Sequence, residues 1–321
     1  FAMTNKYDNS STLQKIVGLK FADSFLKFFK QSSELPGSPG FLDIGVATGY
    51  NSVLTWSKLL STYTRDEEFE LTFSDLPSND WNSVMRNTDH FNGQPFASKL
   101  RFNCTAGSYI QTLRRAGSLN FSLSNLCIHF LTEFEPTLDA FAICCTKDPI
   151  VKAKNAAFAA KSLDNCLKAR ALELKPGGYF ACSFPNAYIG VGNDYYTQSF
   201  HEAIARGDFT EAEVKMMNLP FYVRTVDDIK AAIARLPGQF ELCETDMLSI
   251  DPGKADLGNL TLLMRVVSEI NIKRALQKSR PDANIQAICD EFYNKMAPPP
   301  TQKQMVKGDV DFTLVVLRKL S

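Results

Sequence analysis

The segment FLDIGVATGYNS at residues 41–52 is the feature that most constrains the fold of this 321-residue chain. An apolar run leads into a turn that contains Gly45 and Gly49, and a helical pattern follows over residues 51–61. Glycine adopts backbone conformations that other residues avoid, so it lets a ligand approach the main chain closely. A buried strand that runs through such a turn into a helix is typical of cofactor sites in parallel α/β sheets.

Strand and helix patterns alternate along the rest of the chain. Strands are predicted at 41–45, 70–75, 101–107, 121–130, 179–184, 239–248 and 311–320. Helices are predicted at 11–29, 51–61, 80–88 and 151–174, the last of them stopped by a cap at Gly177 and Gly178. This alternation predicts a Rossmann-like, doubly wound α/β fold with a mostly parallel, seven-stranded sheet. The final strand is expected to lie antiparallel to its neighbours.

Three parts are expected along the chain. Residues 1–185 would form the cofactor-binding core with an N-terminal lid segment. Residues 186–237 show helical and loop patterns without a clear strand, so we expect a helical cap there. Residues 238–321 would complete the core sheet and carry a helical insertion at 258–294.

Composition narrows the class of protein. Lys+Arg and Asp+Glu both number 35, and this balance argues against nucleic acid as the main partner. The chain has no run of 18 apolar residues and no secretory leader pattern, so neither a membrane span nor secretion is expected. Its eight cysteines form no C-x-x-C pair, so we expect no zinc site. We expect reduced, mostly buried thiols and a cytoplasmic protein.

The turn at residues 45–49 favours one cofactor class over another. Dinucleotides need glycine-rich turns of the type G-x-G-x-x-G around a pyrophosphate, but position 47 is alanine here. S-adenosylmethionine (SAM) has no phosphate, and it needs one glycine turn and a carboxylate at the end of the second strand. Asp75 stands at that point and suits a ribose of either cofactor. The alternative interpretation is that Asp43 and Asp75 only cap helices.

Six sequence blocks together resemble the SABATH family, the salicylate, jasmonate and theobromine type of SAM-dependent methyltransferases. They are YDNSSTLQ, FLDIGVATGYNS, FSDLPSNDWNSVMR, TAGSYIQTL, NFSLSNLCIHFLT and LKARALELKPGGYF, and they occur in the order of the family. FSDLPSNDWNSVMR, which matches the N-D-L-P-x-N-D-F-N block, is the most specific of them. The resemblance covers residues 7–185 well and the remainder weakly, for instance through NLPFY at 218–222.

The resemblance implies a set of site residues. Cofactor contacts would come from Tyr7, Ser11, Asp43, Gly45, Asn51, Asp75, Leu76, Ser108 and Tyr109. Gln14, His129 and Phe130 would contact the methyl acceptor and so act as catalytic residues. Tyr7, Ser11 and Gln14 are spaced by four and three residues, so on a helix they would share one face.

Three positions depart from the family pattern. Phe130 stands where the family usually has a tryptophan, so the indole donor to an acceptor carboxylate is missing. Leu126 replaces a tyrosine, which makes the acceptor pocket more apolar. Some members hold a divalent metal through D-x-F-N, but the stretch here is KMMN with Lys215 and Asn218, so no metal is expected. Some members form dimers, which makes a homodimer possible.

The predicted function is methyl transfer from SAM to a small molecule, most simply to the carboxylate of an acid. A carboxylate is ionised at neutral pH because its pKa is about 4, so the in-line displacement needs no general base. Three alternatives stay open: methylation of a nitrogen or a phenol with His129 as base, a SAM-binding protein without turnover whose cap engages a protein partner, and a nicotinamide oxidoreductase.

Overall fold

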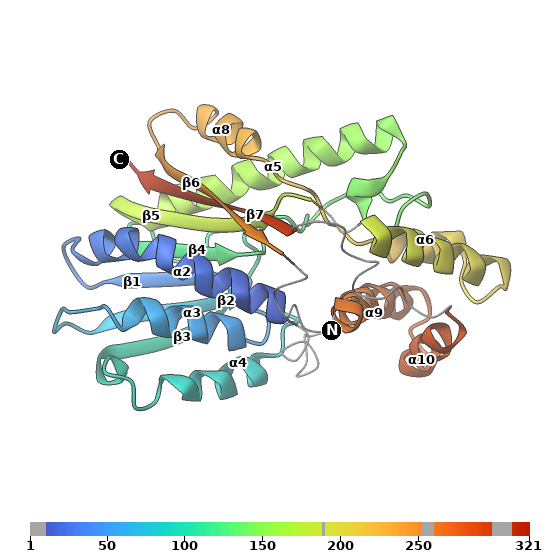
Figure 1. Ribbon diagram of the computed structural model, residues 1–321, viewed down its shortest axis with the longest axis horizontal. Coiled ribbons are helices and arrows are strands. Elements are labelled where there is room, and N and C mark those ends of the chain that lie inside the picture. Colours follow the sequence, from blue (N-terminus) through green and yellow to red (C-terminus); the bar gives the residue numbers. More distant parts are fainter. Residues whose placement is uncertain (1–10, 188–189, 252–259, 297–309) are drawn as a thin grey trace.

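The computed structural model describes residues 11–187, 190–251, 260–296 and 310–321. Its centre is a seven-stranded sheet with the strand order β3-β2-β1-β4-β5-β7-β6 (Figure 1). The strands are β1 (Gly40–Ile44), β2 (Phe69–Asp75), β3 (Leu100–Ala106), β4 (Leu119–Asn125), β5 (Leu174–Pro185), β6 (Phe240–Ile250) and β7 (Val310–Lys319). Only β7 runs against its neighbours, since it pairs antiparallel with both β5 and β6. The predicted fold class and the antiparallel last strand are confirmed.

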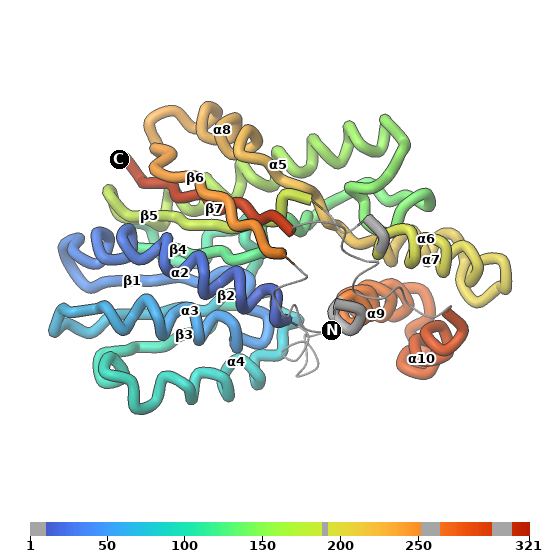
Figure 2. The backbone as a smooth tube through the Cα atoms, in the orientation of Figure 1, coloured from blue at the N-terminus to red at the C-terminus, as the bar shows by residue number. Residues whose placement is uncertain are grey.

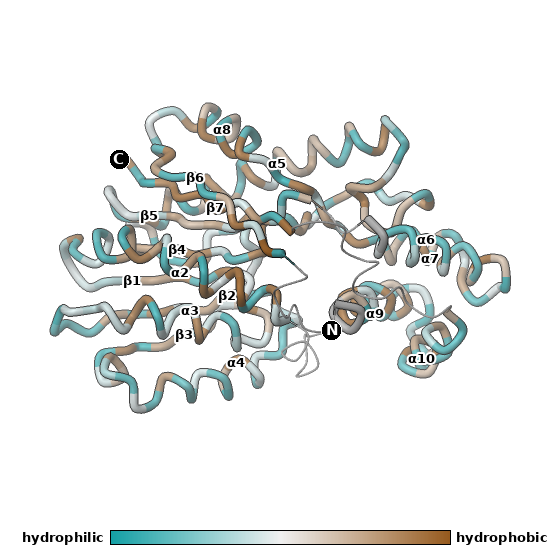
Figure 3. Tube along the Cα trace, in the orientation of Figure 1, coloured by the Kyte–Doolittle hydropathy of each residue, from teal (hydrophilic) through white to brown (hydrophobic). Residues whose placement is uncertain are grey.

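Helices cover both faces of the sheet. On one face lie α2 (Thr12–Ser33), α3 (Tyr50–Leu60) and α4 (Trp81–Asn87); on the other lie α5 (Pro149–Glu173) and α8 (Val226–Ala234) (Figure 1). Neighbouring strand residues point to opposite faces, so Phe41 packs in the cluster under α2 and α3 while Leu42 packs in the cluster under α5. The helices alternate between hydrophobic and hydrophilic residues along their length (Figure 3). None of the helices within the described ranges is long and apolar enough to span a membrane.

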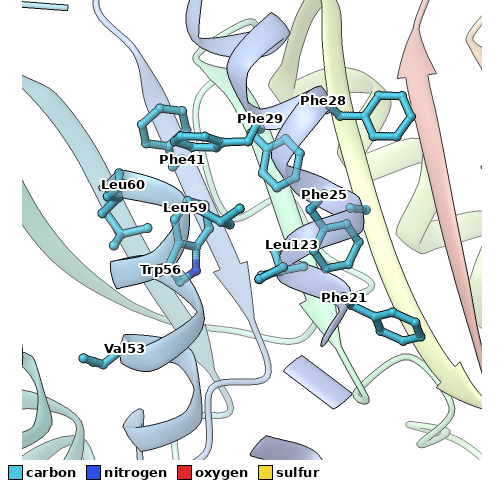
Figure 4. Packing of buried hydrophobic residues seen from close by; sticks show 14 of the residues in the cluster. Phe21, Phe25, Phe28, Phe29, Phe41, Val53, Trp56, Leu59, Leu60 and Leu123 are labelled. Atoms are coloured by element: carbon cyan, nitrogen blue, oxygen red, sulfur yellow. The ribbon is translucent and has the colours of Figure 1, made fainter. Parts of the chain in front are cut away.

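Aromatic rings fix α2 and α3 on the sheet (Figure 4). The ring of Phe29 lies 5.0 Å from that of Phe41, 5.8 Å from that of Phe121 and 6.1 Å from that of Trp56, centroid to centroid. Burial of each such side chain stabilises the fold by roughly 1.5–3 kcal/mol. Because α2 is anchored in this way, its first turn is held above the ends of β1 and β4.

A second layer of helices lies beyond the carboxyl ends of the parallel strands (Figure 2). It consists of α6 (Gly190–Ala205), α7 (Glu211–Met216), α9 (Leu260–Ser279) and α10 (Ile285–Lys295), which we call the cap. The rings of Phe200 and Phe292 stack 5.1 Å apart in its core. Helix α8 falls within the expected cap region 186–237, but it packs on α5 and β6 through Ile229. The division into three parts therefore stays a prediction.

Three local expectations differ from the structure. β4 ends at Asn125 rather than at residue 130, because Leu126 takes a left-handed conformation (φ 52°) and its N–H turns to the carbonyl of Ser183. Gly177 does not cap α5, because the chain is already extended at Leu174; the glycine (φ 81°) instead lies within β5. All eight cysteines are free thiols, as expected, but only three are fully buried: Cys166, Cys182 and Cys289.

Candidate active site

The candidate site lies where the strand order reverses between β1 and β4. In open α/β sheets, ligands bind in the crevice at the carboxyl ends of the strands at such a point. A cavity of about 40 Å³ is found there. It is lined by Gln14 of α2, by Asp43, Gly45, Val46, Ala47 and Thr48 of β1 and its turn, by Asn51, Ser52 and Thr55 of α3, and by Leu123, Asn125 and Leu126 of β4 and its end. This volume holds a few water molecules, so a larger ligand must push the walls apart.

The glycine turn brings backbone close to this cavity. Gly45 has φ 81°, and a Cβ atom at this position would clash with the Sγ atom of Cys127. Gly49 has φ 84° and is the N-cap residue of α3. Ala47, between them, also has a positive φ of 51°, a strained value for a residue with a side chain. Its N–H donates to Asp75 Oδ2 over 2.7 Å, and this bond holds the turn in place.

Asp43 is a buried carboxyl at the end of β1. It accepts a hydrogen bond of 3.0 Å from the indole N–H of Trp56 and caps no helix, because the N-cap of α3 is Gly49. Burial raises the pKa of Asp43 to about 7, and its hydrogen bonds to Ser52 and Trp56 only partly oppose that shift. A carboxyl of this kind favours a nearby positive charge, which would bring its pKa back down.

Asp75, Leu76 and Ser108 lie together at the ends of the paired strands β2 and β3. Asp75 accepts bonds from the N–H groups of Ala47 and Leu76, each over 2.7 Å, and burial raises its pKa. It caps no helix, since the N-cap of α4 is Asp80. The side chain of Leu76 is 42% exposed, so an aromatic ring could cover it. Ser108 carries a buried hydroxyl without a hydrogen-bond partner.

Tyr109 does not reach into this crevice. Its ring lies in the core cluster under α5, and its hydroxyl bonds to the carbonyl of Phe130 over 3.0 Å and to Ser162. Tyr109 therefore connects the end of β3 to the segment after β4, and its contact with a cofactor stays a prediction.

The start of α2 meets the start of α3. Asn51 Nδ2 donates to Ser11 Oγ over 3.1 Å, and Gln14 lines the cavity one turn further on. The amide oxygens of Gln14 and Asn51 are buried and have no partner. Tyr7, the third predicted residue of this face, lies outside the described residues.

His129 and Phe130 lie in the turn that follows β4. The carbonyl of His129 accepts a hydrogen bond of 2.9 Å from the N–H of Tyr222, and Phe130 forms an isolated antiparallel β-bridge with Phe221. The His129 ring is 4.3 Å from that of Phe130 and 4.7 Å from that of Phe221, centroid to centroid. Burial, assisted by the charge of Arg224, lowers the pKa of His129 to about 3. Its Nδ1 atom is buried without a partner.

These orphaned atoms test whether SAM suits the site. Buried polar atoms in native proteins nearly always have a hydrogen-bond partner. Four predicted site residues carry buried atoms without one: Gln14 Oε1, Asn51 Oδ1, Ser108 Oγ and His129 Nδ1. Amide oxygens suit the ammonium group of a methionine, and the hydroxyl of Ser108 suits an adenine edge. The residues therefore fit the cofactor. Asp43 and Asp75, whose pKa values are raised by burial, also suit its positive charge.

Asn218, the last residue of the KMMN stretch, uses its side-chain amide to hold a loop. Asn218 accepts a bond of 2.8 Å from Thr137 N–H and donates one of 3.0 Å to the carbonyl of Ala140. Its amide thereby fixes the loop before α5. Within the described ranges there is no group of three or more His, Cys, Asp or Glu residues that could hold a metal ion.

Two features were missed from the sequence. Arg170 and Glu173 form a fully buried ion pair of 2.6 Å, which binds the backbone of the loop 108–114. Their i, i+3 spacing within the R-x-x-E block was the available signal, but no role was drawn from it. Arg224 is also buried, at 1% exposure, and no sequence pattern pointed to it.

Comparisons with known proteins identify the family of this chain. The profile of the SAM dependent carboxyl methyltransferase family matches residues 3–319. The salicylate/benzoate carboxyl methyltransferase of Arabidopsis thaliana is 23% identical over 97% of this chain and 89% of its own length. Gibberellic acid methyltransferase 2 of the same plant is 25% identical over 65% of this chain and 62% of its own length.

The solved structures agree on the fold. A structure of loganic acid methyltransferase with S-adenosylhomocysteine (SAH) superposes with a TM-score of 0.67 and 18% identity, covering 98% of this chain and 94% of that one. Because the profile that matches residues 3–319 is that of SAM-dependent methyltransferases, the nicotinamide oxidoreductase alternative is set aside. The chain belongs to the SABATH family of SAM-dependent carboxyl methyltransferases.

Proposed function

We propose that this enzyme transfers the methyl group of SAM to a carboxylate oxygen of a small organic acid, and that the residues described above carry the reaction. The observations that support an acid acceptor most directly concern two side chains. His129 is neutral and buried, with a pKa of about 3, and Gln14 lines the crevice with a buried amide oxygen that has no partner. Both can form hydrogen bonds, and neither is a useful base near neutral pH. The relatives named above act on salicylate, benzoate, gibberellic acid and loganic acid by name.

The cofactor would be held along the crevice by named groups of this chain. Asp43, Asn51 and the backbone at Gly45 would hold its methionine end, and Asp75 would bind the ribose hydroxyls. Leu76 and Ser108 would contact the adenine. When bound, SAM supplies an activated methyl group on a positively charged sulfur.

The acceptor would be oriented by neutral donors in a dry pocket. Gln14 Nε2 and a ring N–H of His129 would each donate a hydrogen bond to the carboxylate. These bonds would compensate its negative charge without a cation at the reacting atoms. The rings of Phe130 and Phe221 lie 5.9 Å apart, centroid to centroid, and would form an apolar wall that excludes water. Because charge is neutralised during methyl transfer, a dry site favours the reaction, and alignment is the main contribution of the protein.

A phenol or ring nitrogen would need a different site. Such an acceptor has a proton to remove, and His129 was the expected base. With a pKa of about 3, His129 would be a poor base at neutral pH. The acid is therefore the preferred acceptor.

The test is methyl-ester formation from SAM and a panel of salicylate, benzoate, jasmonate, gibberellic acid and loganic acid, followed by mass spectrometry. We expect an ester from at least one acid. Gln14→Ala should raise the KM for that acid about tenfold, the loss of one hydrogen bond to a charged group. Gln94→Ala, the same change on an exposed loop, is the matched control. Methylation of phenols or amines but not of acids would contradict the proposal.

Two properties of the whole molecule complete the proposal. The free cysteines and the equal numbers of acidic and basic residues support a cytoplasmic enzyme that acts on small molecules rather than on nucleic acid. The family resemblance makes a homodimer possible, and light scattering of the purified chain would test it.

A further inference from the structure

Arg224 is a buried cation whose hydrogen-bond acceptors carry no charge. Its side chain is 1% exposed, Nε donates to the carbonyl of Ile128 over 2.6 Å, and Nη1 donates to the carbonyl of Ala159 over 3.1 Å. Nη2 is buried and has no partner. Buried charges are normally paired or fully hydrogen-bonded, so a guanidinium with an idle donor calls for an explanation.

Arg224 also helps to fix the residues of the acceptor end. Three consecutive carbonyls, those of Ile128, His129 and Phe130, each accept a bond from a different donor. The donors are Arg224 Nε, the N–H of Tyr222 at 2.9 Å and the hydroxyl of Tyr109 at 3.0 Å. The backbone around His129 is therefore held rigidly, and two of its three supports come from residues 222–224.

His129 carries the complementary idle atom. Its Nδ1 is buried and has no partner, while Arg224 Nη2 lacks an acceptor. Arg224 is held next to His129 by its bond to the carbonyl of Ile128, the preceding residue, and its charge contributes to the lowered pKa of His129. A guanidinium can only donate, and a neutral imidazole has one nitrogen that accepts and one that donates.

We propose that Arg224 sets the tautomer of His129: Nη2 donates to Nδ1, directly or through one water molecule, and the ring proton therefore resides on Nε2. The hydrogen bond made by one ring nitrogen decides which nitrogen carries the proton. The Nε2–H group then faces the acceptor and donates to its carboxylate. This last step rests on the proposed function, and it would replace the indole donor that Phe130 lacks. A neutral ring also avoids a second positive charge beside the cationic methyl donor.

The test is ¹⁵N NMR of the histidine rings, which reports tautomer and protonation without turnover. The chain has three histidines, so His90 and His201 serve as internal controls. In the wild-type protein we expect His129 as the Nε2–H tautomer, without titration between pH 5 and 8. Arg224→Met should populate the Nδ1–H tautomer and raise the pKa of His129, whereas Arg224→Lys, which keeps a cation and a donor, should largely retain the wild-type state.

Two results would overturn the proposal. One is an Nδ1–H tautomer in the wild-type protein, which needs no variant to fold. The other is a folded Arg224→Met protein whose His129 signals match those of the wild type. Arg101→Met, which removes an exposed arginine, should leave all three histidines unchanged.

Kinetics separates this proposal from the proposed function. With the panel acid that the wild type esterifies fastest, Arg224→Met should raise the KM of the acid about tenfold and leave the KM of SAM unchanged. An equal rise in both KM values would mean a general structural role for Arg224 and would contradict the donor role of His129. If no acid is esterified but the tautomer is Nε2–H, the carboxylate function fails while the tautomer assignment stands.

Discussion

The buried pair of Arg170 and Glu173 gives the sharpest prediction about the cofactor end of the site. Both side chains are completely buried, and Glu173 Oε1 accepts bonds from the N–H groups of Leu113 and Arg114. Arg170 donates to the carbonyls of Tyr109 and Gln111, the latter over 3.0 Å. The pair therefore holds the loop that carries Ser108, the expected adenine contact.

The two single changes and the double change should have different effects. Arg170→Met or Glu173→Leu leaves one buried charge without its partner, which costs about 3–5 kcal/mol of folding free energy. That is a large share of the roughly 5–15 kcal/mol that stabilises a typical protein. The double variant removes both charges, so its stability should return to within about 1–2 kcal/mol of the wild type. Its loop, however, stays unclamped, and the affinity for SAM should fall at least about tenfold.

Denaturant unfolding and calorimetric titration with SAM measure the two quantities. Arg101→Met, which breaks an exposed ion pair with Glu68, should change neither. A double variant that binds SAM as tightly as the wild type would refute the clamp. A double variant less stable than either single variant would refute the electrostatic reasoning.

Three further predictions concern the crevice. Gly45→Ala should lower the free energy of unfolding by about 1–3 kcal/mol, because the new Cβ would clash with Cys127 and the backbone has φ 81°. The control is Gly93→Ala, where φ is 78° but the space around the residue is open. In the same denaturant titration it measures the conformational cost alone. Burial raises the pKa of Asp43 from 3.8 to about 7, so the folded state holds this proton more tightly than the unfolded state, and the stability of the ligand-free protein should fall as pH rises from about 4 to 7. Asp43→Asn should remove that slope in unfolding measurements at pH 4, 5.5 and 7, and a slope equal to that of the wild type would contradict the assignment. Phe130→Trp adds an indole N–H at the acceptor end, so the KM for the preferred acid should fall several-fold; an unchanged KM would mean that residue 130 faces away from the carboxylate.

The fold could be predicted from local sequence patterns, because its turns and buried helix faces depend on residues that are close together in the sequence. Gly45 and Gly49 mark the turn after β1, and the period of the aromatic residues in α2 marks its buried face. The end of β4 could not be predicted, because the left-handed conformation of Leu126 depends on Ser183, 57 residues further along the chain. The role of Gly177 was misjudged for a related reason, since α5 ends where strand pairing begins.

The site was predictable only where its residues follow strands. Asp43, Asp75 and Ser108 come directly after or at the ends of paired strands, so the topology brings them to one edge. Tyr109 was expected in the same place, but its hydroxyl finds partners 21 and 53 residues away, at Phe130 and Ser162. The partners of Arg224 are even more distant in the sequence: Ile128 lies 96 residues away and Ala159 lies 65 residues away. These contacts exist only after β4, α5 and the segment before α8 have packed together.

A crystal structure with SAH tests the central claim most directly. The account predicts the homocysteine end beside Asp43 and Asn51, the ribose hydroxyls on Asp75, and the adenine between Leu76 and Ser108. It also predicts that the wall of the 40 Å³ cavity opens to admit the ligand. Density for SAH elsewhere on the protein, with the β1–β4 crevice still closed, would contradict it.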